Sequence, residues 1–116
     1  GTMFYTEKED SIQLGTIKHE TGYIEPPHIH KKKEKIILDV VETLHIVYGK
    51  VAVDFFEDDT KYSEVILNPG DTALLIEGTH RIRVLESFKG VKVKQGPYQS
   101  IEDDKEFIEV IETDIN

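Results

Sequence analysis

The stretch Lys50-Val51-Ala52-Val53-Asp54-Phe55-Phe56 (residues 50–56) decides the fold class. Its side chains form two alternating rows, the first made of Val51, Val53 and Phe55 and the second of Ala52, Asp54 and Phe56. Successive side chains of a strand point to opposite faces of a sheet, so this spacing predicts a β-strand.

Similar stretches continue on both sides of it. They are short, apolar and β-branched, they are separated by Gly, Pro, Asn and Asp, and none keeps a clean helical period. We therefore predict an all-β chain, a barrel, sandwich or jelly roll, with strands near residues 11–18, 23–30, 36–48, 50–57, 63–67, 72–76, 81–87 and 91–95, and one more candidate at 105–111.

The expected connections follow from turn chemistry. Tyr48-Gly49-Lys50 predicts a tight turn between two strands, and residues 57–60 an acidic loop. In Asn68-Pro69-Gly70-Asp71, Pro supplies the fixed φ and Gly the positive φ of a type II turn. The continuously apolar residues 73–76 suit a strand buried on both faces, and residues 99–106 read as a surface loop.

Length and composition narrow the class of protein. The 116 residues predict a single domain over 3–116, with Gly1-Thr2 before Met3 typical of an expression-tag remnant. There is no cysteine, so a metal would need His and carboxylate ligands. No apolar run reaches the roughly 18 residues of a membrane span and no signal-like segment opens the chain, so a cytoplasmic protein without a membrane partner is expected.

The charge balance also carries information about partners. The formal net charge of -9 argues against nucleic acid, because phosphate binding needs Lys and Arg. The basic run Lys31-Lys32-Lys33, extended by Lys35, reads as a solvated loop. Its alternative interpretation is a positive field beside a pocket for an anionic small molecule.

Four side chains form a candidate metal site. His28 and His30 follow Pro26-Pro27 at a spacing that places both imidazoles on one face of a strand. Glu42 shares its expected face with Leu44, Ile46 and Tyr48, where a carboxylate is costly unless a cation meets it. His80 shares a face with Ile82 and Val84 and lies opposite Arg81 and Arg83.

A carboxylate and three imidazoles make a mixed shell suited to Fe, Mn, Ni or Zn. His45 should point outward, and neither it nor His19 is given a role.

The sequence resembles the cupin superfamily. The opening of its first motif is matched by Gly22, His28 and His30, and its close by Glu42 and Gly49. Its second motif is matched in part by Gly70, Gly78 and His80, with Ile76 in place of the usual Pro and Val84 in place of the Asn. The resemblance covers about residues 22–98, whose end looks like that of a small single-domain cupin subgroup.

The resemblance implies a double-stranded β-helix, or jelly-roll barrel, with a metal held by His28, His30, Glu42 and His80, and a homodimer. The motif departs between His30 and Glu42. Literal spacing would select Glu34, but no Gly follows Glu34 at the required distance, so Glu42 is assigned to the motif's Glu and residues 31–41 contain an insertion. Our hypothesis is that the apolar part, residues 36–41, is an edge strand or flap covered by a second subunit.

The candidate metal site and the resemblance leave three hypotheses for the function. The first is a metal-binding cupin acting on a small polar molecule such as a sugar or sugar phosphate, or an iron-dependent oxygenase, with Tyr48 and Glu25 as candidates for proton transfer. The second is a sensory or ligand-binding module without catalysis, and the third a structural domain whose histidines only pack. Fold-level analogy does not choose between reactions.

Overall fold

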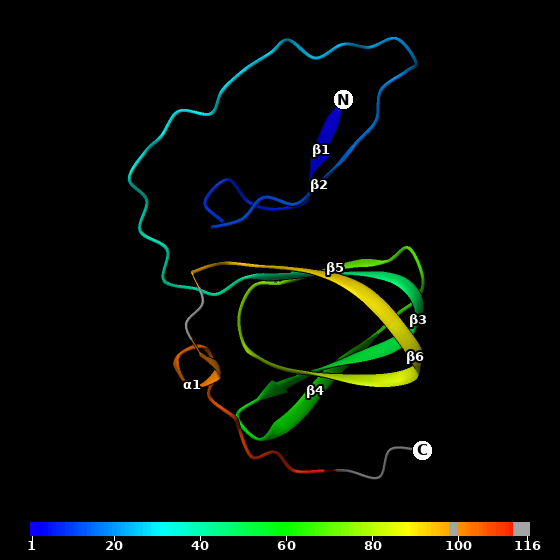
Figure 1. Cartoon of the computed structure of the whole chain (residues 1–116). Helices are drawn as coiled ribbons and strands as arrows, with labels where there is room; N and C mark the ends of the chain where they lie inside the picture. Colours follow the sequence, from blue (N-terminus) through cyan, green and yellow to red (C-terminus); the bar gives the residue numbers. More distant parts are fainter. Residues whose placement is uncertain (98–99, 113–116) are drawn as a thin grey trace. The chain divides into compact units, whose positions relative to one another are not determined.

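The computed structural model describes residues 1–97 and 100–112 (Figure 1). The chain divides into two compact units, Gly1–Asp39 and Val40–Asn116, each with a sheet of its own. The single domain expected over residues 3–116 stays a prediction.

The first unit contains a small antiparallel sheet. Strand β1 (Thr2–Phe4) pairs with β2 (Gly15–Ile17), a shorter strand than the 11–18 predicted. A Cβ at Gly15 would lie 2.5 Å from the Met3 carbonyl oxygen, which explains a glycine at this crossing. The strand predicted at 23–30 is wrong, because these residues have no regular structure; Pro26 and Pro27 lack the N–H groups that a ladder needs.

The second unit contains two long strands, β3 (Glu42–Glu57) and β6 (Thr79–Lys94), which pair antiparallel along their whole length. On the other edge of β3, β4 (Thr60–Leu67) lies beside its second half and β5 (Thr72–Leu75) beside its first. A helical turn, α1 (Ile101–Asp104), follows within the segment expected to be a loop. Residue 99 of that segment lies outside the described residues.

Several strand boundaries differ from the prediction. The break expected at residues 48–50 and the gap expected between 87 and 91 are absent, since β3 and β6 each run on as bent, continuous strands. Residues 36–41 and 105–111 form no strand. Residues 73–76 are not buried on both faces: Leu75 is buried, Ala73 and Leu74 are half-buried, and Ile76 is 39% exposed.

Gly49 explains why β3 bends instead of ending. Its φ is +87°, and the ladder with β6 is irregular on either side of it, as in a β-bulge. A Cβ there would lie 2.2 Å from the Ser87 carbonyl oxygen, so β6 approaches at a distance that only glycine allows. The irregular register also changes which side chains face inward.

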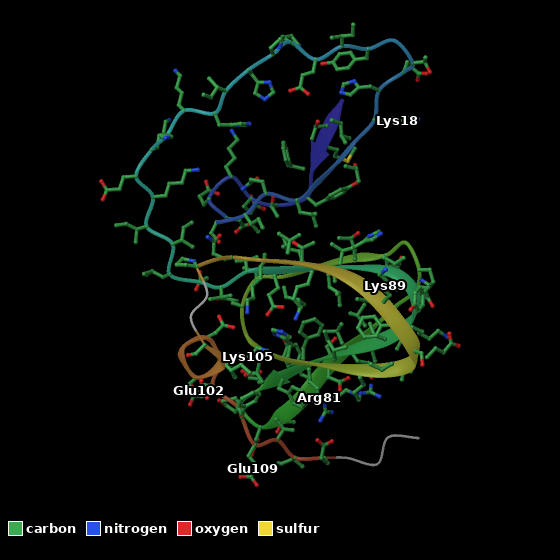
Figure 2. The ribbon with its side chains drawn as sticks, viewed as in Figure 1. Lys18, Arg81, Lys89, Glu102, Lys105 and Glu109 are labelled. Carbon is green, nitrogen blue, oxygen red and sulfur yellow. The ribbon has the colours of Figure 1, made fainter. Side chains whose placement is uncertain are left out.

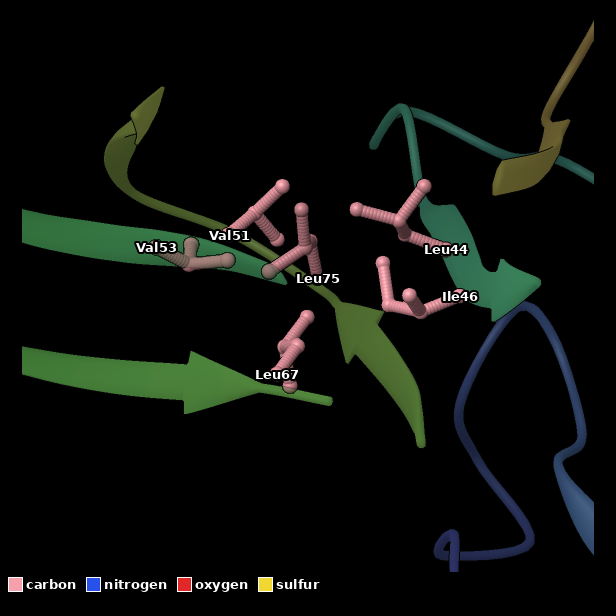
Figure 3. Packing of buried hydrophobic residues seen from close by; sticks show 6 residues of the cluster. All are labelled: Leu44, Ile46, Val51, Val53, Leu67 and Leu75. Atoms are coloured by element: carbon pink, nitrogen blue, oxygen red, sulfur yellow. The ribbon is translucent and has the colours of Figure 1, made fainter. Parts of the chain in front are cut away.

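The core shows this change of parity directly. Even-numbered residues face the core before Gly49 and odd-numbered ones after it, so that one buried cluster contains Leu44, Ile46, Val51, Val53, Leu67 and Leu75 (Figure 3). Tyr48, expected beside Leu44 and Ile46, is instead 55% exposed. Val84, expected beside Ile82, is 56% exposed.

The expected turn at Asn68–Asp71 is confirmed. Gly70 has a φ of +91°, and the Asp71 N–H donates to the Asn68 carbonyl at 2.9 Å. The Asn68 N–H in turn donates to Asp71 Oδ2 at 2.8 Å, closing the turn from both sides. This turn aligns β4 and β5 along the same edge of β3.

The all-β class is confirmed: the regular structure is two antiparallel sheets and one helical turn across residues 1–97 and 100–112. The sheets do not close into a barrel in this described part of the chain. Over the same residues, no helix has the length and apolar character needed to cross a membrane.

Candidate functional site

Glu42 and His80 come together on the inner face of the bent sheet. They start from opposite ends of the β3–β6 ladder, where Glu42 pairs with Lys94 and His80 with Phe55. Nevertheless, His80 Nε2 lies 3.8 Å from Glu42 Oε1, because the long strands curl. The side chains are 30% and 12% exposed, so two of the four predicted ligands meet in a half-buried place.

Both residues are on the apolar face that the sequence predicts. Glu42 lies opposite Leu75, a buried core residue. His80 lies opposite Phe55, which packs against the core cluster. Directly opposed residues of an antiparallel pair share a face, so the carboxylate and the imidazole both stand at the edge of the core.

Lys92 is the third member of this inner cluster and was not predicted. Its Nζ lies 3.4 Å from Glu42 Oε2, and its register partner on β3 is the buried Leu44. The neighbouring Val91 and Val93 are 53% and 54% exposed, so the apolar residues of this stretch face away from the core. A valine–lysine alternation normally indicates the reverse, and this is why the sequence did not reveal Lys92.

The contacts of the two ring nitrogens suit metal ligation at His80. Its Nδ1 lies 3.4 Å from the Gly78 carbonyl oxygen, while its Nε2 points toward Glu42. A ligating histidine commonly uses its second nitrogen on a carbonyl or carboxylate in this way.

The same arrangement recurs at His28 in the first unit. Its Nδ1 lies 2.9 Å from Glu25 Oε1 and 3.1 Å from the Pro26 carbonyl oxygen, which leaves Nε2 available. The rings of His28 and His30 lie close, with centroids 5.2 Å apart, although the segment is not a strand. The predicted proximity of these two imidazoles is thus present without the predicted strand.

The four-ligand set stays a prediction. His28 and His30 belong to the first unit, and Glu42 and His80 to the second. Across residues 1–97 and 100–112, no group of three or more His, Asp or Glu side chains is gathered as a metal site. The described geometry therefore provides two pairs of donors, each within its own unit.

The Glu42–His80 pair is chemically suited to a first-row divalent ion. Metal–nitrogen and metal–oxygen bonds of about 2.1 Å span at most about 4.2 Å between the two donor atoms. The observed 3.8 Å falls within that span. An imidazole and a carboxylate are donors that Fe, Mn, Ni and Zn accept.

The remaining sequence candidates take other places. Tyr48 is exposed beside the Gly49 bulge, and Glu25 is paired with His28. Glu34, the alternative acidic ligand, is exposed in a segment without regular structure. His45, expected to point outward, is half-buried and its Nδ1 lies 2.8 Å from Thr72 Oγ1.

A second cluster of charged side chains lies around Asp54 on β3. The Asp54 side chain is 0% exposed, and it is contacted by Arg81, Arg83 and Lys61 from the flanking strands. These contacts, Arg83 foremost, hold the pKa of Asp54 far below its usual value although burial alone would raise it. Glu64 and Glu112 complete the cluster on its exposed side, so its three cations face three carboxylates.

The sequence predicted that Asp54 lies on the same face as Ala52 and Phe56 and on the other face from Val53. It gave no sign that the Asp54 side chain would be buried. All three cationic partners are saturated with carboxylates, so the cluster is structural in character. Figure 2 shows Arg81 on the stretch of β6 distant from Lys89. The charged group around Asp54 and the one around Glu42 share no residue in these contacts.

Comparisons with protein families, with curated proteins and with solved structures found no match for this chain. The resemblance to cupins therefore stays a prediction from the motif residues.

Proposed function

We propose that this chain is a metal-binding protein of the cupin kind, in which Glu42 and His80 are ligands of a divalent ion; the further ligands expected from the sequence, His28 and His30, stay a prediction. The observation that carries the proposal is the 3.8 Å contact of His80 Nε2 with Glu42 Oε1. The sequence indicates each residue as a polar group on an apolar row. Their meeting from the two ends of a 16-residue strand pairing is a specific outcome of the fold.

The wider proposal is a double-stranded β-helix that binds a small polar molecule such as a sugar or sugar phosphate. The bent, antiparallel β3–β6 pair and the inward-facing polar cluster support it. A bound divalent ion would act as a Lewis acid or, in the case of iron, as an oxygen activator. The chain's own residues would hold the ion and orient the ligand.

Elemental analysis tests the metal site. Protein purified without added metal should contain close to one equivalent of a first-row divalent ion. His28→Ala combined with His80→Ala should lose it, whereas His45→Ala, a half-buried histidine held by Thr72, should retain it. Full occupancy in the double variant would overturn the proposal.

A non-catalytic, metal-dependent binding module is the second candidate. It is favoured by the positions of the two proton-transfer candidates, because Tyr48 is exposed at the bulge and Glu25 is engaged with His28. Assays with sugar phosphates and catechols, with iron and manganese supplied in turn, separate the two candidates. Turnover above the metal-free control supports the enzyme, and ligand binding without turnover supports the module.

A further inference from the structure

Around Val91–Val93, strand β6 has one edge without a strand beside it. Within residues 1–97 and 100–112, β6 pairs with β3 alone. The N–H of Gln95, just after β6, donates to the Val41 carbonyl at 3.0 Å, on the side where β3 lies. Backbone groups of an antiparallel strand alternate in direction, so the N–H and C=O of Lys92 point to the other edge. Such an edge can accept one more strand.

The side chains at this edge make an apolar, basic, apolar triplet. Val91 and Val93 are 53% and 54% exposed and face away from the core. Lys92 lies on the opposite face and is 48% exposed although it contacts Glu42. The strand as a whole is basic, with five cationic residues and one acidic residue: Arg81, Arg83, Lys89, Lys92, Lys94 and Glu86. An acidic strand therefore suits this edge better than a neutral or basic one.

The C-terminal segment, residues 105–112, has the complementary pattern. The sequence predicts a strand at 105–111, yet the segment has no regular structure. Its middle is the apolar, acidic, apolar triplet Ile108-Glu109-Val110, and Glu106 and Glu112 add two more carboxylates against one lysine. Phe107 and Ile108 are 80% and 43% exposed. The segment thus has the composition of a strand and no strand to pair with among the described residues.

The two triplets fit each other as cross-strand neighbours. When Glu109 lies opposite Lys92, Ile108 and Val110 lie opposite the two valines, because directly opposed residues share a face. Opposite charges and apolar pairs at such positions both stabilise a sheet.

The segment's own chain holds its end elsewhere. The Ile111 N–H donates to the Asp59 carbonyl at 2.8 Å, just before β4, and Glu112 forms an ion pair with Arg81. The middle of the segment, residues 106–110, is left mostly exposed and is available to a second copy.

A second segment, Leu38-Asp39-Val40, has the same apolar, acidic, apolar order. It follows the basic run Lys31-Lys32-Lys33 and Lys35, whose charges would be brought toward a basic strand. Charge complementarity therefore favours the C-terminal segment at this edge.

We propose that two copies of this chain associate by strand addition, with residues 106–110 of each copy pairing with the Val91–Val93 edge of the other and Glu109 lying opposite Lys92. The contact is made twice, about a two-fold axis. It does not involve the proposed metal ion, and it places the contact between copies at a different site from residues 36–41.

Charge reversal tests the pairing in the full chain, with light scattering after gel filtration as the measurement. The wild type should be a dimer at micromolar concentrations. Lys92→Glu and Glu109→Lys, each alone, bring like charges together at both contacts and should raise the dimer dissociation constant at least about tenfold. An equal mixture of the two variants should dimerise within about threefold of the wild type, because each contact then joins a lysine and a glutamate.

Matched variants separate charge, backbone and folding. Glu102→Lys makes the same charge change on an exposed residue of α1 (Figure 2) and should leave dimerisation within about threefold of the wild type. Lys92→Pro and Lys92→Ala both lose the ammonium group, but only Pro also loses the N–H at the edge, so the Pro variant should dimerise more weakly. Glu109→Lys lies in an exposed segment without regular structure, so it keeps the test valid if a Lys92 variant fails to fold.

Three results would overturn the inference. They are a wild type that is monomeric at micromolar concentrations, a mixture of the two charge-reversed variants that stays monomeric, and a dimer that Glu109→Lys does not weaken. The last result would place the contact between copies on another surface, with residues 36–41 as the next candidate. None of the three bears on the metal site, which elemental analysis tests separately.

Discussion

Arg83 holds the carboxylate of Asp54 at two points, with Nε donating to Oδ2 at 2.7 Å and Nη2 donating to Oδ1 at 3.0 Å. Arg81 adds two further bonds to Oδ2, and Lys61 Nζ lies 3.1 Å from Oδ1. A bidentate guanidinium contact is among the strongest polar interactions in proteins. The side chain is fully buried, so Asp54 compensates three cations at the centre of the sheet.

Asp54→Asn should destabilise the protein by about 3 kcal/mol, because it leaves the partner cations without their shared carboxylate. The measurement is urea unfolding at neutral pH followed by circular dichroism. Glu57→Gln, at the exposed end of the same strand, is the control and should change the free energy of unfolding by less than about 0.5 kcal/mol. Equal effects of the two substitutions would contradict a stabilising role for Asp54.

The lowered pKa of Asp54 predicts how stability depends on acid. The folded-state pKa is depressed, chiefly by Arg83, so the contribution is complete above the ordinary Asp pKa of about 3.9 and declines as pH falls below it toward the folded-state value. The gap in unfolding free energy between wild type and Asp54→Asn should therefore narrow as the pH falls from about 4 to about 2.5. A gap that stays constant over this range would show that Asp54 does not titrate with unfolding.

The sequence predicted the strand that carries Asp54 and the row on which it lies, because period-two alternation is a local property. It did not predict burial, since this depends on Arg81, Arg83 and Lys61 arriving from two other strands. A buried carboxylate is tolerated only when such partners are present, and their convergence is a property of the whole sheet.

Gly49→Ala should be much more destabilising than Gly70→Ala. Both glycines have a positive φ, +87° and +91°, so both substitutions incur backbone strain. At Gly70 nothing lies within 4 Å of an added Cβ, whereas at Gly49 the Ser87 carbonyl oxygen lies at 2.2 Å. We expect a difference of at least about 2 kcal/mol in urea unfolding, from steric overlap alone.

At residues 48–50 the structure has a bulge within β3 where the sequence predicted a turn between two strands. Glycine at positive φ serves a turn and a bulge equally well, and the sequence does not distinguish them. If Gly49→Ala and Gly70→Ala were equally stable, the close approach of β6 to Gly49 would be wrong.

Two residues of the inner cluster could be predicted from the sequence, and the third could not. Glu42 and His80 were found because a polar group on an apolar row is visible in sequence. Lys92 was not found because Val91 and Val93, its more apolar neighbours, turn outward. The inward direction of Lys92 is set by its pairing with Leu44 across an irregular ladder.

Glu42→Gln and Glu34→Gln decide which carboxylate is the metal ligand, since motif spacing alone allowed both. Glu42 contacts His80 and lies within the sheet, whereas Glu34 is exposed in a segment without regular structure. We expect Zn²⁺ or Mn²⁺ at a hundred times its dissociation constant to stabilise the wild type by about 2.7 kcal/mol, since it binds the folded state. Glu34→Gln should keep this increase and Glu42→Gln should lose most of it, as measured by thermal unfolding with metal and with EDTA.

Because Gln removes the charge with little change of shape, the metal-free melting temperatures of the two variants report any separate effect on folding. If the metal-induced increase persisted in Glu42→Gln and vanished in Glu34→Gln, the acidic ligand would be Glu34 and the contact between Glu42 and His80 an ion pair without a metal role.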